Sequence, residues 1–233
     1  MAHRTLSAQL RSSMGPLSLL TSSIGLKAIM AITGIILTGF LVVHAAGNLT
    51  MFSGREAFNA VPALYESFGP LLWVARLVLL GAVGLHIMSA AKLSTENIGA
   101  RHQRYAVKHT AVTNYAARTM VVSGPIVLLF IIYHLLHLTL RMSPGAFSYE
   151  EGDLYSYMVQ GFQVPWVAWF YAFANVLLGM HLFHGLWSMF QTLGINHPSY
   201  NFHLRALAIT LTLFISGANV LMPLAVLSGA VVL

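Results

Sequence analysis

The sequence predicts an all-α integral membrane protein built from five transmembrane helices. First, hydrophobic residues make up 57% of the 233 residues and charged residues only 8%, and the mean hydropathy is +0.74. A water-soluble domain of this composition would have too little polar surface. Second, the chain contains five apolar runs, each with the roughly 20 residues that a helix needs to cross a bilayer. Third, these runs are continuously apolar without strict alternation, which favours helices over an outer-membrane barrel.

The five predicted spans are separated by short connections, so we expect one membrane domain over residues 1–233. The segment before the first span is too short and too Ser-rich for the apolar core of a cleaved signal peptide, and we expect this span to act as its own insertion signal. No cysteine is present, which excludes disulfides, cysteine-ligated iron–sulfur clusters and thiolate chemistry on this chain. In order, the spans are 28–46 after Lys27, 72–91 before Lys92, 119–140 after Arg118, 165–190 before Gln191, and 206–232 after Arg205.

Basic residues gather on one side of the predicted membrane, with nine of the twelve Lys and Arg residues there. The positive-inside bias therefore predicts a cytoplasmic N-terminus and an outside C-terminus. The basic second connection could by composition bind nucleic acid or an acidic cytosolic protein, but orientation is the simpler explanation, and we expect no nucleic-acid partner. The nine residues are Arg4, Arg11, Lys27, Lys92, Arg101, Arg104, Lys108, Arg118 and Arg205.

Six of the eleven histidines lie within predicted spans. An ionisable side chain in hydrocarbon is costly, so each is a functional candidate, although one such histidine taken alone can equally well join two helices by a hydrogen bond. At about 1.5 Å rise per residue, His44 and His134 lie about 25 and 24 Å from the cytoplasmic edges of their helices. On the same basis His86 and His181 lie about 9 and 15 Å from that edge. Four helices thus supply an outer pair, His44 with His134, and an inner pair, His86 with His181.

Two imidazoles that face each other between helices can ligate a six-coordinate b-type haem from above and below. The two pairs differ in height by about 12 Å, which predicts two stacked haems that carry electrons across the bilayer. His137 and His184 each follow a candidate ligand by three residues and share roughly its helix face, so either member of each doublet could be the ligand. The other member would then contact a haem propionate, water or a neighbouring helix.

Two other functions use the same histidines. The two His-x-x-His doublets could bind the di-iron centre of a membrane oxygenase or desaturase, but they lie at different depths, whereas a dinuclear site needs ligands that converge. A proton-coupled transporter would use the histidines as a proton relay and would contain no chromophore. An absorption spectrum of the purified chain separates these alternatives from a cytochrome.

The segments around the four paired histidines carry further residue patterns. The outer connection after His44 contains Arg55-Glu56-Ala57-Phe58-Asn59. The third span opens with Ala117-Arg118-Thr119-Met120, then has Gly124, and leads to Tyr133-His134. The fourth contains Gly179-Met180-His181-Leu182-Phe183-His184-Gly185-Leu186-Trp187.

With these segments nearly the whole chain resembles the dihaem cytochrome b anchor subunit of succinate:quinone oxidoreductases and quinol:fumarate reductases, the type with a single five-helix anchor. The resemblance implies that His86 and His181 ligate the haem nearer the cytoplasmic subunits. It likewise implies that His44 and His134 ligate the outer haem. The fourth ligand of the family stands four residues before a Gly-Leu-Trp, which identifies His181 and not His184.

The resemblance also implies partners and a location. In such complexes of the bacterial cytoplasmic (inner) membrane, a flavoprotein oxidises succinate or reduces fumarate and an iron–sulfur protein relays electrons on the cytoplasmic side. The multi-pass anchor exchanges these electrons, through two b haems, with a membrane quinone, often menaquinone. This chain would hold neither the flavin nor the dicarboxylate. The resemblance leaves the direction of electron flow and a higher oligomer of the complex open.

Glu66 is the candidate acid or base of the quinone site, with Glu56 behind it. Glu66 lies in the outer connection near the predicted outer haem, where a carboxylate can accept a quinol proton, and a solvated loop residue is the alternative. Certain fumarate reductases of the family carry a proton-transferring glutamate two residues before the fourth ligand. Here that position is Gly179, so we expect no proton path by that route.

Overall fold

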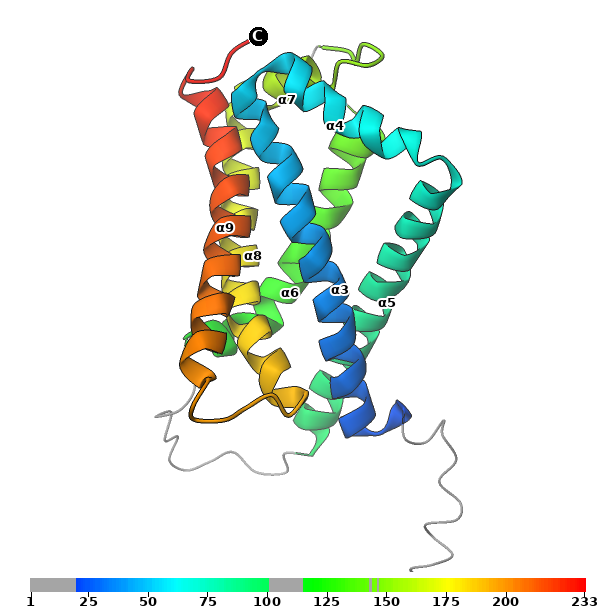
Figure 1. Ribbon diagram of the computed structural model, residues 1–233, viewed down its shortest axis with the longest axis vertical. Helices are drawn as coiled ribbons and strands as arrows, with labels where there is room; N and C mark the ends of the chain where they lie inside the picture. The colour runs from blue at the N-terminus through cyan, green and yellow to red at the C-terminus, as the bar shows by residue number, and fades with distance from the viewer. Residues whose placement is uncertain (1–19, 101–114, 143, 146) are drawn as a thin grey trace, which may run out of the picture.

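The computed structural model describes residues 20–100, 115–142, 144–145 and 147–233. These residues form a bundle of long helices (Figure 1). Five helices are long and apolar enough to cross a membrane, which confirms the predicted all-α fold with five transmembrane helices. The five candidate spans are Ser23–Ser53, Pro70–Gly99, Met120–Thr139, Pro165–Thr192 and Asn201–Leu227.

Three of the long helices begin at residues whose chemistry suits a helix start. At the start of α3 the Ser22 side chain accepts a hydrogen bond from the Gly25 N–H at 3.1 Å. Two helices begin with proline, whose fixed φ and missing N–H suit the first turn. The long helices are α3 (Ser23–Leu49), continued by η1 (Thr50–Ser53), α5 (Pro70–Gly99), α6 (Tyr115–His134), continued by the π-helical η2 (Leu135–Thr139), α8 (Pro165–Thr192) and α9 (Asn201–Leu227).

The structure adds features that the predicted spans did not contain. Two short helices, α4 (Arg55–Ser67) and α7 (Leu154–Gln163), lie across one end of the bundle (Figure 1). The last helix ends at Leu227 rather than at the predicted residue 232, because the chain turns at Gly229 with a φ of 77°, a conformation that glycine adopts without strain. Both short helices cover the ends of the long helices.

We call the end of the bundle where α3 begins the inner end, and the end where α9 stops the outer end. Which end faces the cytoplasm stays a prediction. That prediction rests on nine basic residues. Five of them lie outside the described residues: Arg4, Arg11, Arg101, Arg104 and Lys108.

Helix α8 is the centre of the bundle. It packs along α9 and contacts α6 and α3, and about half of the residues in its apolar 18-residue stretch are buried. Helix α5 is much less buried. It packs mainly against α3 at the edge of the bundle (Figure 1), and only 6% of its apolar 18-residue stretch is buried. Most of the α5 surface is therefore exposed in this chain. This arrangement places α3, α5, α6 with η2, and α8, which carry the six span histidines, around one interior.

The core is densest in the outer half, where aromatic side chains of α6, α7 and α8 meet. Phe130, Phe162 and Tyr171 are each at most 8% exposed and belong to one cluster. Its edge-to-face ring contacts, such as Phe162 with Tyr171 at 5.0 Å, are the arrangement that aromatic quadrupoles favour. The inner half has a smaller aliphatic cluster between α8 and α9, made of Leu178, Leu182, Leu186, Ala208 and Ile215.

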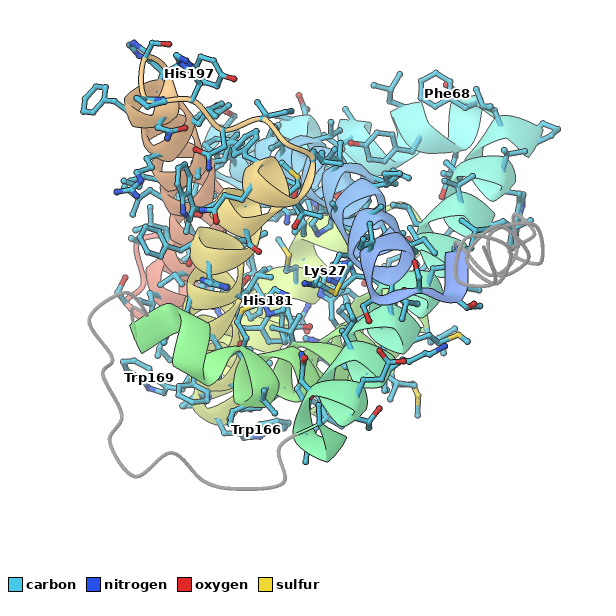
Figure 2. All side chains as sticks on the ribbon, turned by 90° about the horizontal axis from the view of Figure 1, so that it is seen from below. Lys27, Phe68, Trp166, Trp169, His181 and His197 are labelled. Carbon is cyan, nitrogen blue, oxygen red and sulfur yellow. The ribbon has the colours of Figure 1, made fainter. Side chains whose placement is uncertain are left out.

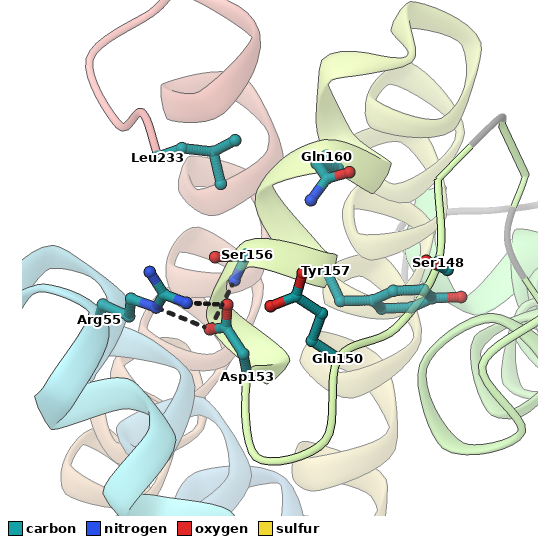
Figure 3. A pocket seen from close by; sticks show the side chains of 8 residues that line it. All are labelled: Arg55, Ser148, Glu150, Asp153, Ser156, Tyr157, Gln160 and Leu233. Carbon is teal, nitrogen blue, oxygen red and sulfur yellow. Dashed lines mark hydrogen bonds and ion pairs between the residues drawn. The ribbon is translucent and has the colours of Figure 1, made fainter.

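An ion pair ties the two short outer helices together. Asp153 caps α7 by accepting a hydrogen bond from the Ser156 N–H at 3.2 Å. It also accepts from Asn59 Nδ2 and from Arg55 Nε, both at 3.0 Å. The Arg55 guanidinium forms a salt bridge with Asp153 (Figure 3). Burial acts to raise the pKa of Asp153, but the hydrogen bonds from Ser156, Asn59 and Arg55 outweigh it and lower the pKa to about 2.

Candidate functional site

The structure brings His44 of α3 together with His134 of α6 in the outer half of the bundle. The two ring centres lie 5.7 Å apart and the ring planes are nearly perpendicular, at 86°. Phe40 stacks on His44 at 5.3 Å, and Phe130 lies 5.8 Å from His134. Nδ1 of His134 is buried and has no hydrogen-bond partner among the described residues. Aromatic packing, and not a hydrogen bond, therefore holds the His134 ring.

The structure also brings His86 of α5 together with His181 of α8, nearer the inner end. Their ring centres lie 6.4 Å apart with an interplanar angle of 58°. Seen from the inner end, His181 lies inside the ring of helices, whereas Trp166 and Trp169 lie on its outside (Figure 2). Each inner histidine has a hydroxyl beside its Nδ1, at 3.0 Å for His86 and 3.4 Å for His181.

Both pairs have the spacing that one ligated metal atom needs. Two imidazoles on opposite sides of a metal have ring centres about 6 Å apart, because each metal–nitrogen bond is about 2 Å and each nitrogen lies about 1 Å from its ring centre. The observed separations of 5.7 and 6.4 Å match this requirement. Neutral imidazole nitrogens between apolar helices are also the donor set of a bis-histidine haem. The residues present therefore fit a haem at each level.

His137, the second histidine of its doublet, lies in a different environment from His134. It sits on the π-helical η2, where the wider turn shifts side chains away from α-helical register. The side chain is 1% exposed, and its Nδ1 forms a hydrogen bond with the Tyr171 hydroxyl at 2.9 Å. Its other nitrogen, Nε2, is buried against Gly161 and has no partner among the described residues. His137 thus belongs to the aromatic core beneath α7.

His184, the second histidine of the other doublet, is half-buried on α8. The described residues that surround the doublets offer no group of three His, Asp or Glu side chains that converges on a metal-sized site. The structure therefore gives no support to a di-iron centre built from the two doublets.

Glu66 lies in the last turn of α4, on the outer surface. It is exposed and lines a shallow hollow of about 550 Å³ together with Trp73 and Arg76 of α5. The Arg76 guanidinium lies over the Trp73 ring, 4.9 Å from its centre. Glu56 is exposed in the first turn of α4. The acid or base role of these carboxylates stays a prediction.

Gly179, two residues before His181, lies where α8 packs closely against Ser216 of α9. A Cβ atom there would stand 2.7 Å from the Ser216 hydroxyl oxygen and 3.0 Å from the Ser216 Cβ. The Ser216 hydroxyl in turn donates to the Asn175 carbonyl at 2.8 Å, which fixes its position. Packing against α9 therefore leaves no space for a side chain at this position.

The sequence prediction included Gly124 but missed Thr33, Gly34 and Ser123, which complete two hydroxyl–glycine pairs that contact the inner histidines. Thr33-Gly34 of α3 lies against His86, and Ser123-Gly124 of α6 lies against His181. One signal was present: each hydroxyl residue stands eleven residues before the outer histidine of its own helix. The inner histidines show a second regular spacing: Pro70 stands sixteen residues before His86, and Pro165 sixteen residues before His181.

The four paired histidines thus come from two similar halves of the chain, α3 with α5 and α6 with α8. Within each half, one helix carries the hydroxyl–glycine pair and the outer histidine, and the other carries the inner histidine. Comparisons of this chain with protein families, with curated proteins and with solved structures found no match.

Proposed function

We propose that this chain is a membrane cytochrome b that anchors a succinate:quinone oxidoreductase or quinol:fumarate reductase and carries electrons through two b haems. One observation carries the proposal: four helices each contribute a histidine, and the four rings meet as two pairs with centres 5.7 and 6.4 Å apart. One pair lies in each half of the bundle. Polar ligands at two depths suit electron transfer across a bilayer better than they suit one compact catalytic centre.

The residues that would hold the haems are the two pairs. His44 and His134 would ligate the outer haem, and His86 and His181 the inner haem. Bound haem supplies reversible one-electron chemistry at its iron. The chain supplies neutral ligands on rigid helices, apolar walls that exclude water, and hydroxyls that hold a proton on Nδ1 of the inner imidazoles.

The two ends of the bundle would then meet different partners. The flavoprotein and iron–sulfur subunits would dock at the inner end, where the predicted orientation places the cytoplasm, and dicarboxylate chemistry would belong to the flavoprotein. A membrane quinone, menaquinone being the expected species, would react at the outer end, where Glu66 lines a hollow between α4 and α5. The chain would act in a bacterial cytoplasmic membrane, as part of a complex and not alone.

The absorption spectrum of the detergent-purified chain, with haem quantified as the pyridine haemochrome, tests the proposal. We expect two b haems per chain in the wild type, and one in each of the single variants His44→Ala and His86→Ala. The matched control is His203→Ala, an exposed histidine of α9 outside both pairs, which should keep both haems.

Two outcomes would overturn the proposal. Iron without a Soret band would indicate a non-haem centre, and substrate uptake by vesicles that contain this chain alone, without a chromophore, would indicate a transporter. If the histidine variants each kept two haems, the pairing would be wrong.

A further inference from the structure

Each inner imidazole is cradled by a hydroxyl–glycine pair from the preceding helix of its half. Thr33 Oγ1 lies 3.0 Å from Nδ1 of His86, and Ser123 Oγ lies 3.4 Å from Nδ1 of His181. The adjacent glycines, Gly34 and Gly124, bring the backbone against the Cε1 edge of each ring. A Cβ at either glycine would stand at ordinary contact distance, 3.8 and 3.9 Å, from that edge. Both rings are therefore touched at the same two positions.

The Thr33 hydroxyl has one proton to donate, and the Ile29 and Met30 carbonyls of α3 both lie within hydrogen-bond distance, at 2.8 and 3.2 Å. Thr33 Oγ1 donates to the Ile29 carbonyl one turn earlier, at 2.8 Å. With that proton directed to a carbonyl, the hydroxyl oxygen accepts a hydrogen bond when Nδ1 of His86 carries a proton. This tautomer carries its proton on Nδ1 and a lone pair on Nε2, the nitrogen that is then free to bind a metal. Ser123 repeats the pattern at longer distance, with Met120 as the acceptor at 3.5 Å.

The two hydroxyls are buried where a polar group needs a partner. Thr33 is 4% exposed and Ser123 is 1% exposed, although both lie in apolar membrane helices. A backbone carbonyl of the same helix accepts a hydrogen bond from each hydroxyl, so the contact with an imidazole pairs the remaining hydroxyl lone pairs with a ring nitrogen. The equal spacing of eleven residues to His44 and to His134 places each pair about three helical turns below an outer histidine. The same arrangement occurs in both halves of the chain.

We propose that Thr33 and Ser123 are positioning residues that orient His86 and His181 toward a shared inner metal centre and set its reduction potential. This inference rests on the proposed function. A hydrogen bond accepted from Nδ1–H increases the electron density on the imidazole, which makes Nε2 a stronger donor to ferric iron. The hydroxyls therefore strengthen haem binding at the inner level and lower the inner reduction potential. The outer pair, whose His134 Nδ1 has no such partner in the described part of the chain, is the internal reference.

The test is a potentiometric titration of both haems in the wild type and in Thr33→Val, Thr33→Ser and Ser123→Ala. Thr33→Val keeps the side-chain shape and removes the acceptor. We expect it to weaken retention of the inner haem about tenfold, to raise the inner reduction potential and to change the EPR g values of the inner ferric haem. The outer haem should keep its potential. Thr33→Ser should restore the wild-type values, and Ser123→Ala should have a smaller effect because its bond is longer.

Thr38→Val is the matched control, since Thr38 is a buried threonine of the same helix. It should leave both potentials unchanged. If Thr33→Val and Ser123→Ala both bind two haems with the wild-type inner potential and g values, the positioning role is wrong while the cytochrome assignment stands. If the wild type binds no haem, the proposed function itself fails. If Thr33→Val does not assemble, the Ser123→Ala titration decides by the same criteria.

Discussion

The outer and inner histidine pairs lie in one bundle, yet different forces hold them. The outer rings are fixed by aromatic neighbours, Phe40 against His44 and Phe130 against His134. The inner rings are fixed by hydrogen bonds between Nδ1 and hydroxyls of neighbouring helices. The packing around the two pairs also differs. The outer half holds the densest aromatic core, whereas α5, which carries His86 of the inner pair, is mostly exposed. In the densely packed outer half aromatic rings hold the histidines, and in the more sparsely packed inner half a hydroxyl contacts each imidazole.

The second histidines of the two doublets give the sharpest test of this difference. His137 is 1% exposed and bonded to Tyr171, whereas His184 is half-buried on the sparser side. We expect His137→Leu to lower the free energy of unfolding by about 3 kcal/mol, because it leaves the Tyr171 hydroxyl buried without a partner. His184→Leu should change it by less than about 0.5 kcal/mol. Unfolding in mixed micelles, followed by circular dichroism, measures both. Loss of a haem in His184→Leu would contradict the choice of His181 as the ligand.

Two glycines allow the same comparison by adding one methyl group in each half. A Cβ at Gly161 would stand 2.7 Å from Nε2 of His137, whose ring is held by its bond to Tyr171 and has nowhere to move. Gly161→Ala should therefore destabilise the chain by about 2 kcal/mol through overpacking. Gly185, near the inner pair, has nothing within 4 Å of its Cβ position, so Gly185→Ala should be neutral or stabilising in the same unfolding measurement. If both substitutions changed the free energy of unfolding equally, the two halves would not differ in how densely they are packed at these positions.

Much of the fold was predictable because it follows from hydropathy. The five spans are confirmed by five long helices, and the fixed rise of a helix converts sequence position into depth. That is why His44 and His134, on separate helices, were expected at one level. The prediction that the last span continues to residue 232 was wrong, since apolar residues after Gly229 carry no sign that the helix has already ended.

The remaining features depend on contacts that no local pattern records. The π-helical turn at Leu135–Thr139 changes the register after His134, so the equal spacing of the two doublets hides unequal surroundings. The bond between Thr33 and His86 joins residues 53 positions apart and depends on how α3 crosses α5. The spacing of eleven residues shared by both halves was visible in the sequence, but only the structure shows what stands opposite each hydroxyl.

Two tyrosines sharpen the comparison within the outer half alone. The Tyr171 hydroxyl is bonded to His137, whereas the Tyr133 hydroxyl is buried with no partner among the described residues. Tyr171→Phe should lower the free energy of unfolding by about 1 kcal/mol, and Tyr133→Phe should be neutral or slightly stabilising. Both variants should leave the inner haem potential unchanged, because neither residue contacts His86 or His181. A shift of that potential in Tyr171→Phe would show that the two levels are coupled.

The smallest expected effect concerns the ion pair over the outer half. The pKa of Asp153 lies near 2, below its ordinary value of 3.8. Because the folded-state pKa is lowered, the carboxylate stabilises the folded state fully above about pH 4 and loses this contribution as the pH falls toward 2. The Arg55 side chain is 59% exposed, so the contribution should not exceed about 1 kcal/mol.

Asp153→Asn, measured against the wild type between pH 5 and pH 2, tests this expectation. The variant should unfold more readily at pH 5, and the difference should shrink as the wild-type carboxylate becomes protonated. Glu150→Gln is the control, because Glu150 is exposed and lines the same outer hollow as Asp153 (Figure 3). If Asp153→Asn unfolded like the wild type already at pH 5, the cap of α7, which an asparagine can also form, and not the charge of Asp153, would join the outer helices.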